Sequence, residues 1–194
     1  MIKKTGIVGF ALAVLCPAVP VTAQTPAPRA TIQTSMGNIV VELDAEHTPA
    51  TVANFVLYAK EGHFDGTMIY RVAPGFVIQM GSIDAQGMSR TVHDPIPLET
   101  ANAASNLRGT ISMARADDPN SATAEFFINL ADNSGLDHMA DDHDNKTGYA
   151  TFGHVVEGMD VVDRIAMVPL MGGVGPFPDA DPATPVTITK VTVQ

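Results

Sequence analysis

Three kinds of feature are scarce in this sequence, and each scarcity excludes a class of protein. Among 194 residues there is a single cysteine, Cys16, so no intramolecular disulfide can form. Basic residues number 11 against 21 acidic ones, a formal net charge of −10. Such a surface repels phosphates, which argues against nucleic acid or anionic lipid as a partner. The apolar run from Ile7 to Cys16 is shorter than the roughly 20 residues of a membrane span, so we expect no stable membrane association.

The same apolar run lies in a segment that is typical of a secretory signal peptide. Lys3 and Lys4 precede the run, and small residues lead up to Ala23. We therefore expect residues 1–23 to be a signal peptide, which would make the mature protein periplasmic or secreted. Cleavage also removes Cys16. Residues 24–30 are rich in proline and alanine and are expected to form a flexible leader, and residues 31–194 suit a single domain.

The domain contains eight short strand-like runs separated by segments with Gly, Pro, Asn and Asp. These runs are 31–34, 38–43, 68–72, 76–80, 109–114, 126–130, 149–156 and 186–193. Their number and spacing predict a closed or nearly closed antiparallel sheet. In the last run the apolar parity switches between Ile188 and Val191, which indicates a bulge or a change of buried face.

Two segments have the periodicity of amphipathic helices. Thr48 followed by Pro49 predicts a helix start, and Gly62 a stop. Between them, apolar residues recur at i, i+3, i+4 and i+7; they are Val52, Phe55, Val56 and Ala59. Residues 159–167 predict a second helix, and a glycine-rich turn follows at 172–175.

Arg71 is a single cation within an apolar stretch, so it faces either solvent or a lined cleft. Pro74 and Gly75 predict a tight turn that brings Phe76 and Gln79 back beside Arg71. A cation, an aromatic ring and a neutral amide would then lie together. That set suits a ligand with an apolar ring next to a polar amide.

Three segments resemble the cyclophilin family of peptidyl-prolyl cis-trans isomerases. YRVAPGFVIQMG, residues 70–81, is similar to the active-site strand pair of that family. Residues 109–138 and 149–165 resemble its second and third blocks, in the same order. The resemblance implies an all-β fold with two helices, an eight-stranded antiparallel β-barrel capped by an α-helix at each end.

The resemblance also implies roles for ten residues. Arg71 takes the place of the catalytic arginine, with Gln79 binding substrate backbone and Phe76 in the pocket. Val77, Phe127 and Leu136 would line the pocket for the substrate proline. The main chain of Ala114 and Arg115 would pair with the peptide, Tyr149 stands at a pocket position, and Glu125 lies beside the cleft.

The implied reaction is rotation about X-Pro bonds in unfolded or flexible exported polypeptides. Amide resonance opposes this rotation with a barrier of roughly 18 to 20 kcal/mol. At the twisted transition state the proline nitrogen becomes a better hydrogen-bond acceptor, so a guanidinium at Arg71 would stabilise that state selectively. This chemistry needs no metal or other cofactor, and we expect the protein to be a monomer.

Departures from the family pattern give further expectations. Glu125 replaces a common glutamine, and one hypothesis is that it draws Arg71 into an ion pair and lowers activity; the alternative is a carboxylate facing water. Gly135 replaces a large residue, often tryptophan, so we expect a more open rim and weak cyclosporin binding. Tyr70 and Met80 are expected to be packing substitutions.

Other interpretations of the chain remain to be weighed. Residues 138–144 combine histidine with aspartate, which suggests either a peripheral metal site or a solvated loop, and their spacing matches no defined metal loop. A proline-peptide binding or chaperone module with weak or no isomerase activity is the main alternative function. A hydrolase would need a nucleophile motif, and none surrounds the histidines or serines.

Overall fold

A computed structural model describes residues 27–139, 147–170 and 180–194 of the chain. Eight antiparallel strands follow one another in the order β3-β4-β6-β5-β7-β2-β1-β8. The two end strands, β3 and β8, also approach each other, through a bridge between Met68 and Thr187 and a hydrogen bond from Ile69 N to Val186 O at 2.8 Å. The sheet is thus a nearly closed barrel, as expected.

The strands lie close to the runs that the sequence predicts. They are β1 (Arg29–Thr34), β2 (Gly37–Leu43), β3 (Thr67–Ala73), β4 (Val77–Asp84), β5 (Thr110–Met113), β6 (Phe126–Asn129), β7 (Thr151–Glu157) and β8 (Ile188–Val193). β1 starts within the expected leader, because Ala30 is fully buried and pairs with Val41. In β8 the register shifts opposite Gln33 and Thr34, which agrees with a bulge, one of the two explanations given for the parity switch.

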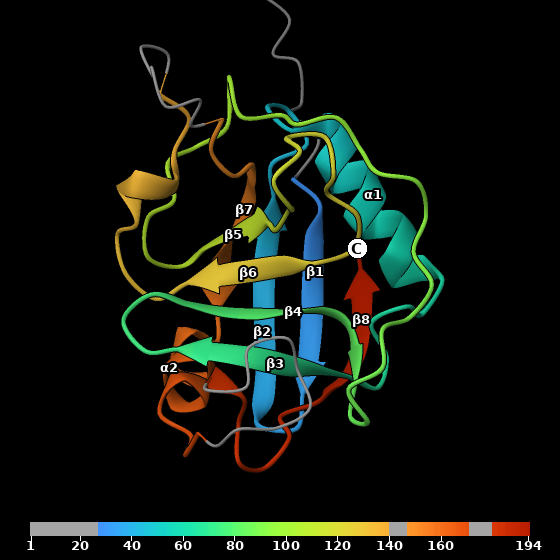
Figure 1. Cartoon of the computed structure of the whole chain (residues 1–194), viewed down its shortest axis with the longest axis vertical. Helices are drawn as coiled ribbons and strands as arrows, with labels where there is room; N and C mark the ends of the chain where they lie inside the picture. Colours follow the sequence, from blue (N-terminus) through green and yellow to red (C-terminus); the bar gives the residue numbers. More distant parts are fainter. Residues whose placement is uncertain (1–26, 140–146, 171–179) are drawn as a thin grey trace, which may run out of the picture.

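Two helices cover opposite ends of the barrel (Figure 1), α1 (Pro49–Lys60) and α2 (Met159–Ala166). α1 turns Val52, Phe55 and Ala59 inward, and α2 buries Val161, Val162 and Ile165. Inside the barrel, the ring of Phe55 lies 5.3 to 5.4 Å from the rings of Phe64, Phe126 and Phe152. This aromatic cluster makes the interior a packed core. The glycine-rich turn expected at 172–175 lies outside the described residues.

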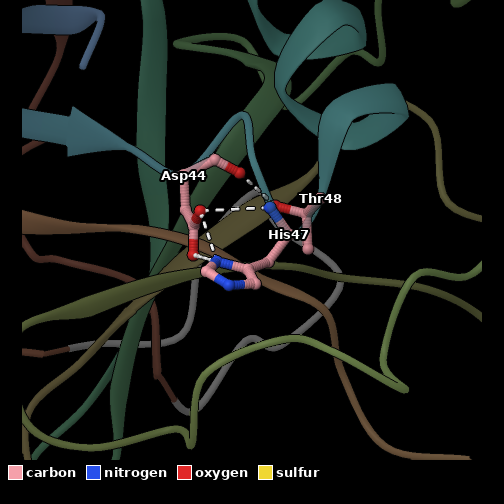
Figure 2. A network of polar contacts seen from close by, with 3 residues as sticks. All are labelled: Asp44, His47 and Thr48. Carbon is pink, nitrogen blue, oxygen red and sulfur yellow. Dashed lines mark hydrogen bonds and ion pairs between the residues drawn. The ribbon is translucent and has the colours of Figure 1, made fainter. Parts of the chain in front are cut away.

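α1 starts at the predicted place, but a side chain from a distant segment caps it. Thr48 is the N-cap residue but makes no side-chain capping bond. Figure 2 shows why: Thr48 Oγ1 lies 3.0 Å from Asp44 O and donates to it, while the Asp44 carboxylate binds His47 Nδ1 at 2.8 Å. Glu99 supplies the cap instead, since its carboxylate accepts from Ala50 N at 3.1 Å and from Thr51 N and Oγ1 at 2.8 and 2.7 Å.

Within the described ranges, neither helix is long and apolar enough to cross a membrane.

Candidate functional site

The hairpin of β3 and β4 brings the expected catalytic groups together. Phe76 N donates to Ala73 O at 2.9 Å, and Gly75 has φ of 75°, as a turn with Pro74 before glycine requires. The turn sets Arg71 opposite Gln79. Arg71 Nη1 donates to Gln79 Oε1 at 3.1 Å, and the guanidinium carbon lies 5.7 Å from the centre of the Phe76 ring. The sequence-based arrangement of cation, ring and amide is present.

These groups form one side of a cavity of about 240 Å³. Nine of the ten predicted site residues line it: Arg71, Phe76, Val77, Gln79, Ala114, Arg115, Phe127, Leu136 and Tyr149. Val77 and Phe127 are buried at its floor, with 2 and 4 % of their surface exposed. The cavity therefore combines an apolar floor with a polar rim. Their individual roles stay predictions.

Arg115 and Tyr149 form another part of the cavity lining. The Arg115 guanidinium carbon lies 4.9 Å from the centre of the Tyr149 ring, and Arg115 Nε donates to Gly148 O at 3.0 Å. The Tyr149 ring in turn meets Phe127 edge to face at 5.6 Å. Arg115 is thus bound to the segment that carries Tyr149, which holds the tyrosine ring against the cavity floor.

The main-chain N–H group of Ala114 already donates a hydrogen bond within the protein. Ala114 N donates to Glu125 O at 2.9 Å, so it is the carbonyl of Ala114 that can accept a hydrogen bond from a peptide lying along the cavity.

Glu125 does not contribute to the lining of this cavity, and the ion pair suggested for it is not formed. Its Oε1 accepts from Ser82 N at 2.7 Å. Among the described residues, no ion pair joins Glu125 to Arg71. Its Oε2 is buried without a hydrogen-bond partner of good geometry. Burial raises the pKa of this carboxyl group.

Tyr70 has a polar function that the sequence analysis missed. The expectation of a packing substitution is correct for Met80, which is fully buried in the core, and incomplete for Tyr70. Gln79 Nε2 donates to the Tyr70 hydroxyl at 2.6 Å. Burial, with the nearby Glu125 second, raises the pKa of the hydroxyl far above its usual value. The register of β3 shifts between Ile69 and Arg71, so Tyr70 and Arg71 together oppose Gln79.

A partly buried polar cluster supports the part of the cavity lining that Leu136 and Tyr149 form. Asn106 Nδ2 donates to Asp137 Oδ1 at 2.9 Å and lies 3.3 Å from the carbonyl oxygens of Leu136 and Tyr149. Ser105 Oγ also donates to the Asp137 carboxylate. Burial alone would raise the pKa of Asp137, but the hydrogen bonds from Ser105 and Asn106 together outweigh it and lower the pKa below its usual value. The cluster ties together the two segments that present Leu136 and Tyr149.

The alternative chemistries find no support in the described residues. His63 Nε2 lies 3.0 Å from Ser82 Oγ, the spacing of a nucleophile and its base, but Ser82 is only 3 % exposed and lies outside the cavity. No cluster of three metal-binding side chains occurs in 27–139, 147–170 and 180–194. Most of the acidic segment 138–144 lies outside the described residues, so a metal there stays untested.

Comparisons with known proteins agree with this geometry. The family model described as "Cyclophilin type peptidyl-prolyl cis-trans isomerase/CLD" matches residues 29–193. A relative named peptidyl-prolyl cis-trans isomerase A, from Dickeya dadantii, is 41% identical over 174 residues, which cover 90% of this chain and 88% of the relative. Peptidyl-prolyl cis-trans isomerase B of Escherichia coli is 40% identical over 164 residues, which cover 84% of this chain and 98% of the relative.

Solved structures show the same fold. A crystal structure of a Cryptosporidium parvum cyclophilin-type isomerase, determined in the presence of the dipeptide Ala-Pro, matches with a TM-score of 0.72 at 21% identity. The match covers 86% of this chain and 98% of that one. At that identity the likeness supports the architecture alone.

Proposed function

Because the chain belongs to the cyclophilin-type peptidyl-prolyl cis-trans isomerase family, we propose that its cavity binds a substrate proline and that Arg71 accelerates rotation about the preceding peptide bond. The isomerase activity itself rests on the family and on relatives 40 to 41% identical over most of the chain. The single observation that supports the role of Arg71 is its place at the rim of an apolar cavity, where Gln79 and Phe76 hold it.

The proposed mechanism depends on the difference between the planar and twisted peptide bond. The proline ring occupies the apolar floor formed by Val77 and Phe127, while the preceding residue turns. In the twisted state the proline nitrogen regains its lone pair, and the Arg71 guanidinium donates a hydrogen bond to it. Neither planar isomer offers that acceptor, so the interaction lowers the barrier and not merely the dissociation constant. No nucleophile, metal or proton transfer takes part.

Turnover of a proline tetrapeptide, measured by line-shape or exchange NMR, tests this role. Arg71→Ala should lower kcat about 100-fold, as loss of one transition-state donor does, while the peptide still binds. Arg71→Lys keeps the charge but loses the planar set of donors, and should restore little. Arg164→Ala is the matched control, because Arg164 lies on α2 and pairs with Asp160 at 2.6 Å. Unchanged turnover in Arg71→Ala would exclude the proposed mechanism.

The same experiment separates the enzyme from the binding module. A module that only binds proline peptides would show saturable binding without exchange between the isomers in the wild type. An isomerase shows both, and Arg71→Ala leaves only the binding.

We also propose that the enzyme acts on exported polypeptides. The support is the sequence of residues 1–23, with its basic start, short apolar run and small residues before Gln24. Mass spectrometry of the protein recovered from the periplasm or medium of a secreting host should find Gln24 as its first residue. Retention in the cytoplasm with Met1 to Ala23 intact would contradict export and would leave the isomerase proposal unaffected.

A further inference from the structure

A second cavity, here called the side cavity, adjoins the one proposed to bind the substrate proline. Its volume is also about 240 Å³. Alanine, serine and threonine side chains between positions 100 and 105 line it together with Asp137, His138 and Tyr149. Tyr149 lines both cavities. A polypeptide that places a proline in the first cavity can therefore extend past this ring into the second.

The side cavity carries a negative charge that no neighbouring cation neutralises. Asp137 accepts hydrogen bonds from Ser105 Oγ, Asn106 N and Asn106 Nδ2, and all three donors are uncharged. No lysine or arginine is among the described residues that line the cavity, and none of the ion pairs in the described ranges includes Asp137. A carboxylate offers about four acceptor positions. Asp137 therefore keeps room for one more donor, and its charge favours a cation.

The same hydrogen bonds hold the side cavity in shape. Asn106 is fully buried, and its main-chain N donates to Asp137 Oδ1 at 2.7 Å. Tyr149 N donates to Leu136 O at 2.9 Å. The segment that ends at Asn106 is thus fixed to the two segments that carry Asp137 and Tyr149. Because the carboxylate is held in place in advance, a ligand that binds it does not have to order it.

We propose that the side cavity is a specificity subsite, which binds the side chain of a lysine or arginine near the proline of the same substrate polypeptide. Asp137 accepts the hydrogen bond of that side chain. The inference rests on the proposed function, since it takes the proline to occupy the neighbouring cavity. An extended chain advances about 3.3 Å per residue, and the two cavities share one tyrosine side chain. The basic residue should therefore lie about two to four positions from the proline.

Dissociation constants of proline peptides, measured by NMR titration, test the subsite without depending on turnover. Each peptide carries one lysine within about four residues of the proline, and its reference carries glutamine at that position. Lysine at one or two positions should lower Kd about threefold, the size of a partly exposed ion pair. Glutamate at those positions should raise Kd. Titrations at about pH 8 keep ordinary histidines uncharged, and a rise in salt from about 0.05 to 0.5 M should weaken the preference.

Turnover and signal positions give independent readouts. The favoured lysine should lower KM and leave kcat unchanged, because the contact is the same in the planar and twisted states of the peptide bond. The main-chain amide signals of Ala101, Ser105 and His138 should move with the lysine peptide more than with the glutamine peptide.

Variants at Ala101 test the charge without disturbing the hydrogen bonds of Asp137. Ala101 is exposed and lines the side cavity. Ala101→Lys places a competing cation there and should abolish the lysine preference, whereas Ala101→Gln adds a side chain of similar length without charge and should keep most of it. Ala183→Lys is the matched control, since Ala183 is also exposed but lines neither cavity; it should keep the preference in full. Asp137→Asn should abolish it.

Three results would overturn the inference. One is an equal Kd for lysine and glutamine peptides at every position. Another is a preference of similar size at all positions, or one that Ala183→Lys reduces as much as Ala101→Lys does, because general attraction to a chain of net charge −10 would explain both. The third is a preference that survives Ala101→Lys. If Asp137→Asn does not fold, the comparison of Ala101→Lys with Ala183→Lys still decides.

Failure of the subsite and failure of the proposed function are distinguishable. Arg71→Ala should lose turnover and keep the lysine preference in Kd. If Arg71→Ala is fully active, the proposed mechanism is wrong, and the dissociation constants still show whether the side cavity binds a basic side chain.

Discussion

The capping of α1 by Glu99 leads to a prediction about stability. The carboxylate accepts from two main-chain N–H groups at the first turn, those of Ala50 and Thr51, and from the Thr51 hydroxyl. Removing a cap costs about 1 kcal/mol, and loss of a negative charge from a helix N-terminus about 0.3 to 1 kcal/mol more. Glu99→Ala should therefore lower the free energy of unfolding by about 2 kcal/mol.

Graded variants test the origin of that effect. Glu99→Gln keeps one acceptor oxygen and loses the charge. It should therefore lower the free energy of unfolding by about half as much as Glu99→Ala does. Glu46→Ala removes an exposed carboxylate just before the same helix and should change stability by less than about 0.5 kcal/mol. Urea denaturation, followed by circular dichroism with the m-value checked for constancy, measures all three. A loss below about 0.5 kcal/mol in Glu99→Ala would show that the three hydrogen bonds do not stabilise the helix start.

Three further predictions concern single positions. An added Cβ at Gly135 touches nothing within 4 Å, so Gly135→Trp should extend the cavity rim and tighten cyclosporin inhibition about tenfold, the equivalent of about 1.4 kcal/mol; an unchanged inhibition constant would refute the open-rim explanation. Gly81→Ala places a Cβ 2.7 Å from Ala124 O at a backbone φ of 152°, so it should lower the free energy of unfolding by about 1 to 3 kcal/mol. Gly135→Ala should leave that free energy unchanged in the same urea assay. The hydrogen bond to Asp44 raises the pKa of His47 above 6.5, so its stabilisation is complete below that value and disappears as pH rises through the higher folded pKa. His47→Ala should therefore lower the unfolding midpoint at about pH 5.5 and not at about pH 9; equal losses at both would contradict the assignment.

Local sequence patterns predicted the features that depend on neighbouring residues alone. The apolar parity of 186–193 predicted a bulge or a change of buried face, because buried and exposed positions alternate along a regular strand, and β8 has a register shift there. Pro74 and Gly75 predicted the turn that sets Arg71 beside Gln79. The cavity lining came from the family resemblance, which carries three-dimensional information that no local pattern holds.

The missed features depend on contacts between distant segments. Glu99 lies 48 residues from Thr51, and nothing near Thr48 shows that its hydroxyl binds Asp44 instead of capping the helix. Strict alternation places Tyr70 and Arg71 on opposite faces of β3, so only the register shift reveals that both reach Gln79. The partner of Glu125 was likewise assigned by charge, whereas the fold supplies a main-chain donor at Ser82.

The meeting of β3 with β8 has a consequence for how the protein is made. All nine lining residues lie between positions 71 and 149, whereas the strand that covers the outer edge of β3 begins at Ile188. During synthesis from the amino end, the hairpin of β3 and β4 is therefore available well before its last neighbour arrives. Until then the edge of β3 exposes unpaired main-chain groups, which other extended chains can bind. The slowest step in folding should be the formation of this long-range contact between β3 and β8. The isomerase would then itself depend on protection of one sheet edge until its carboxyl-terminal strand has emerged.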